Sequence, residues 1–210
     1  MRRVIYADGR LRWRGAVVLD FEIRFVHVAV AFLAALVSEL ALKRWAIPRI
    51  AELADNRTYF IDRNIPWLLD GCKRGYSARD VQMHLDALGP KAREYYARWY
   101  IPVYDLIFPI ALLVFGTLSC LWMTQLRAGF AASVGAEWRL TILMMPLALF
   151  VFDMLENLSV LIILKTYPRQ GMALVAAASA FTQAKWVSAY LAGLLAVLLL
   201  VIGAVRWWQG

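Results

Sequence analysis

The chain has 210 residues, of which 62% are hydrophobic and 18% charged, and its formal net charge is +8. Soluble globular chains carry about 45–50% apolar and about 25% charged residues, so this composition favours an integral membrane protein. Two cysteines and two histidines argue against a disulfide scaffold and a histidine-rich zinc site. The basic charge predicts contact with anionic lipid and not with nucleic acid, because no basic soluble domain is evident.

Residues 1–24 are predicted to form a basic N-terminal arm, because no apolar core of a signal peptide precedes residue 16. The remainder, 25–210, is predicted to be a membrane domain. Its four apolar segments cover about 25–42, 101–126, 140–164 and 172–205. Each must be a helix, since an unpaired backbone amide in lipid costs several kcal/mol. The expected fold is an all-α bundle of four transmembrane helices with both termini on one side, and Pro109 and Pro146 are expected to kink two of them.

A long loop, 43–100, separates the first two segments. Ser77 followed by Asp80 predicts a helix start, and the sequence Gly89-Pro90 predicts its end. The apolar positions of this helix are Val81, Leu85 and Leu88. A second short helix is expected over 91–99. Both are interpreted as amphipathic helices in the headgroup layer, with a solvated connector as the alternative.

Polar residues inside or beside the apolar segments are the strongest functional signal. They are Glu39, Asp105, Asp153, Glu156, Asn157 and Lys185. A charge at mid-bilayer costs at least about 2.5–3.5 kcal/mol, so these side chains should face the bundle. At 1.5 Å per residue, Asp153 lies roughly 18 Å from the end of the third segment, and Lys185 about 20 Å from the start of the fourth. The two should therefore pair, at the closed end of a polar funnel that opens on the long-loop side.

The charge balance of this cluster suggests more than a structural pair. Asp105, Asp153 and Glu156 face one lysine, so full ionisation would leave a formal charge of −2. At least one carboxyl is therefore expected to be protonated at neutral pH. Such groups in a membrane core serve transport or chemistry, and Asp153 and Glu156 are the candidate acid/base residues. The alternative is a buried ion pair that only sets the helix register.

Other specific sites are disfavoured. A divalent-cation site would need more acidic residues, and a retinal-type Schiff base at Lys185 would need more helices. Nucleophilic catalysis lacks a histidine, because His27 is expected toward the other face and His84 on the polar side of the loop helix. We therefore expect no metal and no cofactor.

The strings GYSARDVQMHLDALG, YIPVYDLIFP, FDMLENLSVLIIL and FTQAKW, in this order, resemble a set of bacterial four-helix membrane proteins. The resemblance covers about residues 71 to 190 and leaves out the arm and the first span. It implies the topology only. The location we expect for the chain is a bacterial inner (cytoplasmic) membrane. It groups Asp105, Asp153, Glu156, Asn157 and Lys185 as one site but implies no role for them.

Three functions remain open from the sequence. The first is a pocket for a lipid or small amphipathic ligand, with or without enzymatic acid/base chemistry; here Asn157 would orient the headgroup. The second is an accessory subunit of a larger membrane complex. The third is a proton-coupled transporter or channel subunit, which would have to form a homo-oligomer because the chain has no second repeat.

Overall fold

The computed structural model describes residues 3–5, 11–13, 23–62, 66, 68–126 and 136–209. Within the predicted arm, strands β1 (Arg3–Ile5) and β2 (Leu11–Trp13) pair antiparallel. Apart from this pair, the described elements are helices. Of the other residues of the arm, Ile23 and Arg24 lead into α1, and the remainder lie outside the described part of the chain.

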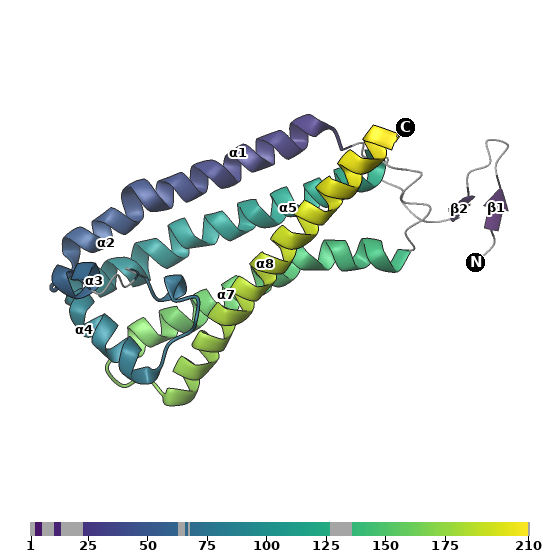
Figure 1. Ribbon diagram of the computed structural model, residues 1–210. Coiled ribbons are helices and arrows are strands. Elements are labelled where there is room, and N and C mark those ends of the chain that lie inside the picture. Colours follow the sequence, from purple (N-terminus) through teal and green to yellow (C-terminus); the bar gives the residue numbers. More distant parts are fainter. Residues whose placement is uncertain are drawn as a thin grey trace.

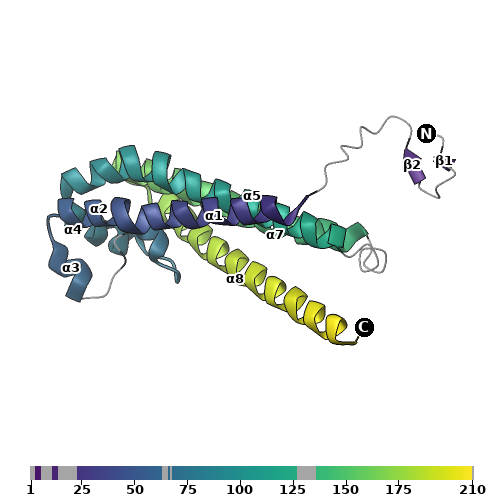
Figure 2. The same ribbon diagram turned by 90° about the horizontal axis from the view of Figure 1, so that it is seen from above.

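Long helices form the body of the molecule (Figure 1). They are α1 (Phe25–Ala41), α5 (Leu106–Leu126), α7 (Ala136–Thr166) and α8 (Met172–Gln209). α5 packs between α1 and α7, and α7 packs against α8. The C-terminal half of α8 diverges from the layer formed by the other three (Figure 2).

Three helical stretches among the described residues are long and apolar enough to cross a membrane. They are Phe25–Leu53, Ala78–Trp122 and Met144–Thr166. This finding is compatible with an integral, multi-pass membrane protein, because a spanning helix needs about 20 mostly apolar residues. The fourth span, which α8 would supply, stays a prediction.

The first two predicted segments belong to longer helices than expected. The π-helix η1 (Leu42–Ala46) carries α1 directly into α2 (Ile47–Leu53). Likewise α4 (Ala78–Tyr95) continues through the π-helix η3 (Tyr96–Asp105) into α5. The prediction of a separate short helix over 91–99 is therefore wrong. The irregular hydrogen bonding of η3 accommodates Pro102, which lacks a backbone donor, without ending the helix.

The start and the break of the loop helix are confirmed. Ser77 is the N-cap of α4, and its hydroxyl oxygen accepts from the Asp80 amide while the Asp80 carboxylate accepts from the Ser77 amide. Gly89 has φ 72° and ψ 171°, so α4 consists of two helical pieces that meet there. A positive φ is costly for any residue with a side chain, which explains glycine at this corner.

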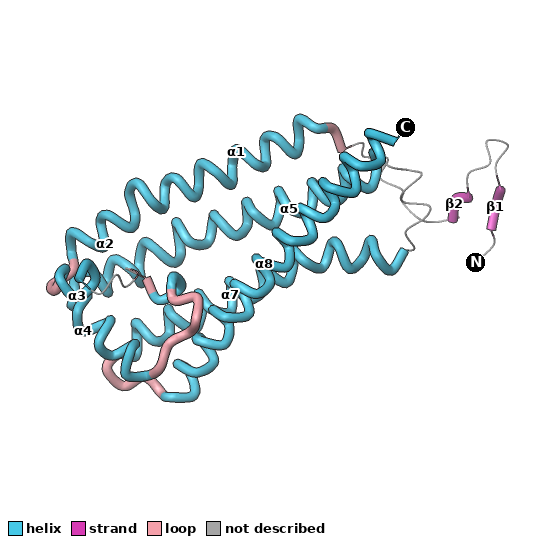
Figure 3. Tube along the Cα trace, viewed as in Figure 1, coloured by secondary structure: helices cyan, strands magenta, loops and turns pink. Residues whose placement is uncertain are grey.

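The described residues of 43–100 (43–62, 66 and 68–100), called the cap below, fold into a packed unit at one end of the bundle. Most of the loops of the described residues also lie at this end, apart from the short stretch before α1 (Figure 3). Besides α2 and α4, the cap contains most of η1, α3 (Arg57–Asp62), the 3₁₀ turn η2 (Leu69–Gly71) and the first half of η3. Its buried core includes side chains from α7 and α8. Members with no more than 1% exposure include Ile50, Phe60, Leu69, Val81, Leu85, Leu88, Tyr96, Ile163 and Val175.

This packing bears on the predicted headgroup-layer position of the loop helices. That position is not confirmed, because the apolar side of α4, formed by Val81, Leu85 and Leu88, is buried against protein. The expectation for His84 is wrong: it is 2% exposed, and its ring meets Phe60 edge-on at 5.0 Å between centroids. A helix with one apolar side can turn it toward lipid or toward a protein core, and the sequence pattern is the same in both cases.

Polar contacts join the cap to α8 and to the turn after α7. The Tyr76 amide donates to Ser179 Oγ of α8 at 2.8 Å, and the Tyr167 hydroxyl, in the turn after α7, donates to Asp86. Lys73 Nζ lies 4.2 Å from the ring centroid of Trp186 on α8. The segment between η2 and α4 is thereby held against α8.

Candidate functional site

Three polar residues of α7 are buried among the helices. Asp153, Glu156 and Asn157 share one helix face because their spacing is i, i+3, i+4. Glu156 has no exposed surface, and Asp153 and Asn157 are 8% and 7% exposed. Charged groups are seldom buried so fully unless they are paired.

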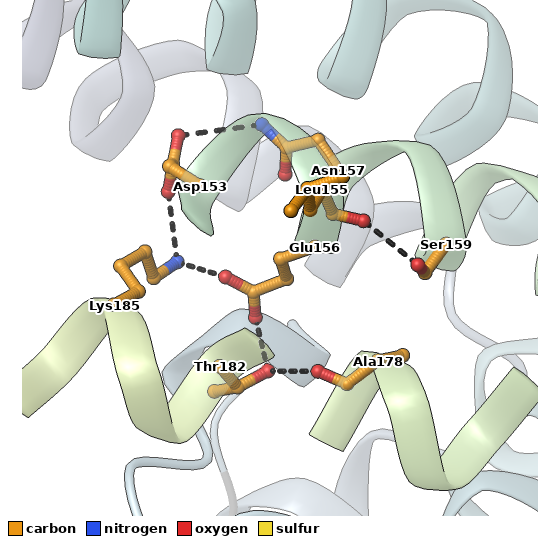
Figure 4. A network of polar contacts seen from close by, with 8 residues as sticks. All are labelled: Asp153, Leu155, Glu156, Asn157, Ser159, Ala178, Thr182 and Lys185. Atoms are coloured by element: carbon orange, nitrogen blue, oxygen red, sulfur yellow. Dashed lines mark hydrogen bonds and ion pairs between the residues drawn. The ribbon is translucent and has the colours of Figure 1, made fainter. Parts of the chain in front are cut away.

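Lys185 on α8 contacts both carboxylates of this face (Figure 4). Its Nζ lies 3.0 Å from Asp153 Oδ1 and also contacts Glu156 Oε2. Asn157 Nδ2 lies 3.5 Å from the other oxygen of Asp153, which is a long contact. The ammonium group therefore bridges two acidic side chains that are one helical turn apart.

Thr182 completes the contacts of Glu156 and was not predicted as a site residue. Its hydroxyl is hydrogen-bonded to Glu156 Oε1 and lies 3.1 Å from the carbonyl oxygen of Ala178. A hydroxyl carries one hydrogen, so it donates to one of these oxygens at a time. When it donates to the carbonyl, it can accept from a protonated Glu156. The position can thus satisfy either protonation state of that carboxyl.

A cavity of about 300 Å³ adjoins this cluster. It is lined by residues of α1, η1, η3, α5, α7 and α8 and by the first residue of α2. Its apolar and aromatic lining consists of Leu42, Ile47, Tyr100, Phe108, Pro109, Leu112, Leu113, Pro146, Leu149, Phe150, Trp186 and Ala189. Its charged lining consists of Glu39, Lys43, Asp105, Asp153 and Lys185.

The structure brings four of the six predicted residues onto this cavity: Glu39, Asp105, Asp153 and Lys185. Glu156 and Asn157 are not part of its lining; Glu156 lies behind Lys185, against Thr182. The expected polar funnel is therefore a largely apolar cavity with charged groups at separate points. The shape of this cavity is set by how several helices pack together, so residue spacing along one helix cannot predict it.

The charged lining has an outer and an inner part. Glu39 and Lys43 pair at 2.6 Å, and their side chains are 42% and 65% exposed. Asp105 is 6% exposed, and the side chains of Asp153 and Lys185 are 11% and 12% exposed. Lys43, Tyr100 and Trp186 were missed as lining residues. Lys43 had a signal, because it follows Glu39 at the i, i+4 spacing of helical ion pairs.

Within the described residues, no group of three or more histidine, cysteine, aspartate or glutamate side chains is placed to hold a metal ion. The donor chemistry of the site consists of carboxylates, an ammonium, a hydroxyl and an amide. Such groups can bind a charged or hydrogen-bonding headgroup and can exchange protons with it.

Comparison of the chain with protein-family models, with curated proteins and with solved structures finds no match in any of the three sets.

Proposed function

We propose that this chain is a four-span membrane protein whose cavity binds a lipid or another small amphipathic ligand. One observation carries the proposal: a cavity of about 300 Å³ joins apolar walls to buried charged side chains. Ligand sites are mostly apolar, with a few polar groups that fix orientation, and their volumes begin at about 300 Å³. An amphipathic molecule matches both parts of such a lining.

The fourth span is α8. It has 38 residues, and its segment from Trp186 to Val205 carries no charged residue. Four spans would place both termini on one side of the membrane. We propose that this membrane is the bacterial inner membrane. Single cysteines replacing Arg10 and Val205, in a chain without Cys72 and Cys120, should label from the same side of sealed vesicles. Labelling from opposite sides would exclude four spans.

Within the site, Asp153 is the group best placed to exchange a proton with a bound ligand. It lines the cavity and contacts Lys185, whereas Glu156 contacts Lys185 from outside the lining. Whether this exchange serves catalysis is a separate question, because ligand binding alone would use the same contacts. The immediate partners in this proposal are membrane lipids, and assembly into a homo-oligomer or a larger membrane complex is compatible with it.

Native mass spectrometry of protein extracted from membranes tests the binding proposal. We expect a defined lipid or small amphipathic molecule to remain bound to the unaltered chain. Ala189→Phe places a ring in the cavity lining and should remove this species. Ala180→Phe, on an exposed position of the same helix, is the matched control and should retain it. If neither the unaltered chain nor the control retains a ligand, the proposal is wrong.

A further inference from the structure

We infer that this cavity opens sideways between α1 and α8, and that its ligand is a long-chain membrane lipid that enters from the bilayer through this opening. The inference rests on the proposed function and deepens it, because it names the source of the ligand and the side by which the ligand reaches the site. It follows from the order in which the helices pack, from the closed cap end of the cavity and from the surfaces beside the opening.

The helices around the cavity do not pack into a closed ring. α1 packs against α5, α5 against α7 and α7 against α8, whereas no comparable packing joins α8 to α1 or to α5 among the described residues. Residues of α1 and of α8 nevertheless line the same cavity: Glu39 on one side, and Trp186 and Ala189 on the other. α8 also leans away from the layer of the other long helices (Figure 2). α5 and α7 therefore form the back wall, and the side between α1 and α8 is the one that helix packing leaves open.

The cap closes one end of the cavity. At this end η1 packs against η3, and Ile47 and Tyr100 belong to the lining. Within one helical turn of these two residues, Ala46, Ile50 and Tyr96 are at most 1% exposed and belong to the core of the cap. A water-soluble molecule that entered through the cap would have to displace side chains from this filled interior and would lose their packing. Entry through the cap is therefore disfavoured.

Exposed apolar side chains border the opening on both helices. On α1, Leu36 lies one turn before Glu39 and Leu40 directly follows it, and both leucines are exposed. On α8, Val187 and Leu191 are exposed. The helical stretch that contains α1 is long and apolar enough to cross a membrane, and the outer side chains of a spanning helix contact lipid. An opening between these two surfaces leads into the bilayer.

The size of the cavity suits a ligand that lies only partly inside it. About 300 Å³ is at the lower end of the volumes of sites that enclose a small molecule. A lipid with a long alkyl chain is larger than such a site, but an open side lets the end of the chain remain among the bilayer lipids and out of water. Its head would pass the exposed pair of Glu39 and Lys43 and reach Asp153 and Lys185 inside.

Two photoreactive alcohols of different length test the route into the cavity. Octadecanol and hexanol, each carrying a diazirine near its hydroxyl group, are added to phosphatidylcholine nanodiscs that hold the unaltered chain. Mass spectrometry after illumination identifies the labelled positions. Octadecanol stays in the bilayer, because each further methylene group favours transfer out of water. We expect it to label Leu112 and Phe150 on the back wall of the cavity, besides the exposed Leu191 on α8.

A bulky group at the opening shows by which side the probe enters. Glu39→Cys, in a chain without the two native cysteines, is reacted with fluorescein maleimide in detergent before reconstitution. Octadecanol should then lose its labelling of the back wall and retain that of the exposed position on α8. Glu52→Cys with the same adduct is the matched control, because Glu52 is also an exposed carboxylate in an ion pair, with Arg49, but lies outside the lining. Unreacted Glu39→Cys should be labelled like the unaltered chain.

The outcomes separate the inference from the proposed function. If hexanol labels the back wall and octadecanol does not, the cavity binds amphipathic molecules but is closed to the bilayer, and the inference is overturned. It is also overturned if the adduct on Glu39→Cys leaves the octadecanol labelling unchanged, because entry then does not lie between α1 and α8. If neither alcohol labels the back wall, the inference fails, and the proposed function fails with it only when the chain also retains no ligand from membranes.

Discussion

The cap and the cavity, two regions of one helical bundle, bury side chains of opposite chemistry. In the cap, Ile50, Leu85 and Leu88 are fully buried among other apolar residues. Around the cavity, Asp105 and Asp153 are nearly as inaccessible, although their side chains are ionisable. Burying a leucine contributes about 1.5–3 kcal/mol, whereas a buried charge is costly even when paired. The cap therefore supplies stability, and the cavity retains groups that a purely structural core would not need.

The largest expected effect comes from separating the buried charges. Lys185→Met leaves Asp153 and Glu156 without their shared cation, and the free energy of unfolding should fall by an amount on the order of 3–5 kcal/mol if both stay ionised. Uptake of a proton would reduce this loss. Thermal unfolding in detergent measures it, with Lys165→Met, at an exposed end of α7, as the control.

A double-mutant cycle tests whether the two groups act as a pair. Asp153→Asn should also destabilise the protein, and the double variant with Lys185→Met should recover part of the combined loss. Recovered stability without recovered ligand binding would show that the pair serves binding as well as packing. Strictly additive losses, or neutral single variants, would contradict the pairing.

Truncating one leucine in each region compares their packing. Leu85→Ala in the cap core should lower the free energy of unfolding by about 3 kcal/mol, because it opens a void in a filled interior. Leu113→Ala should cost about 1 kcal/mol, because Leu113 is half-buried and already borders open space. Chemical denaturation in mixed micelles can measure both. Equal losses would mean that the cavity wall is packed like the cap core.

A substitution at Gly89 tests whether the break in α4 requires glycine. Gly89→Ala should destabilise by about 2 kcal/mol through backbone strain alone. A Cβ at Gly89 would also lie 1.9 Å from Asp55 Oδ2, so the turn after α2 would have to move. Gly193→Ala on α8 is the control, since a Cβ there meets nothing within 4 Å. Far-UV circular dichroism during heating should show a lower melting temperature for Gly89→Ala only.

The smallest expected effect concerns the contact between the cap and the turn after α7. Burial and the hydrogen bond to Asp86 raise the pKa of Tyr167 above its ordinary value of 10.0. The folded state thus favours the neutral phenol, and this contribution is present below pH 10 and lost as pH rises through the raised pKa. Tyr167→Phe should therefore melt slightly below the unaltered chain at pH 8, and this difference in melting temperature should close as the pH rises through the raised pKa of Tyr167. If the difference in melting temperature did not change with pH, titration of the Tyr167 hydroxyl would not contribute to the stability of the folded state.

Residue spacing predicted the local features of the fold and only part of the site. The Ser77 cap and the Gly89 break depend on neighbouring residues, and both are confirmed. Depth counting placed Asp153 and Lys185 at one level, and their side chains are in contact. The contact of Lys185 with Glu156 and the partnership with Thr182 depend on how α7 and α8 are rotated about their axes, which spacing does not fix. The cavity depends on the packing of several helices at once.

The π-helix η3 has a consequence for how this protein can vary. It lies between α4, which belongs to the cap, and α5, and it ends at Asp105 on the cavity. A π-helix holds more residues per turn than an α-helix, and each added or removed residue turns the following helix by about 100°. Gain or loss of one residue within Tyr96–Asp105 would therefore change the azimuth of Asp105 relative to the cap. Length variation in this one segment would therefore change the charged lining of the cavity without the substitution of any core residue.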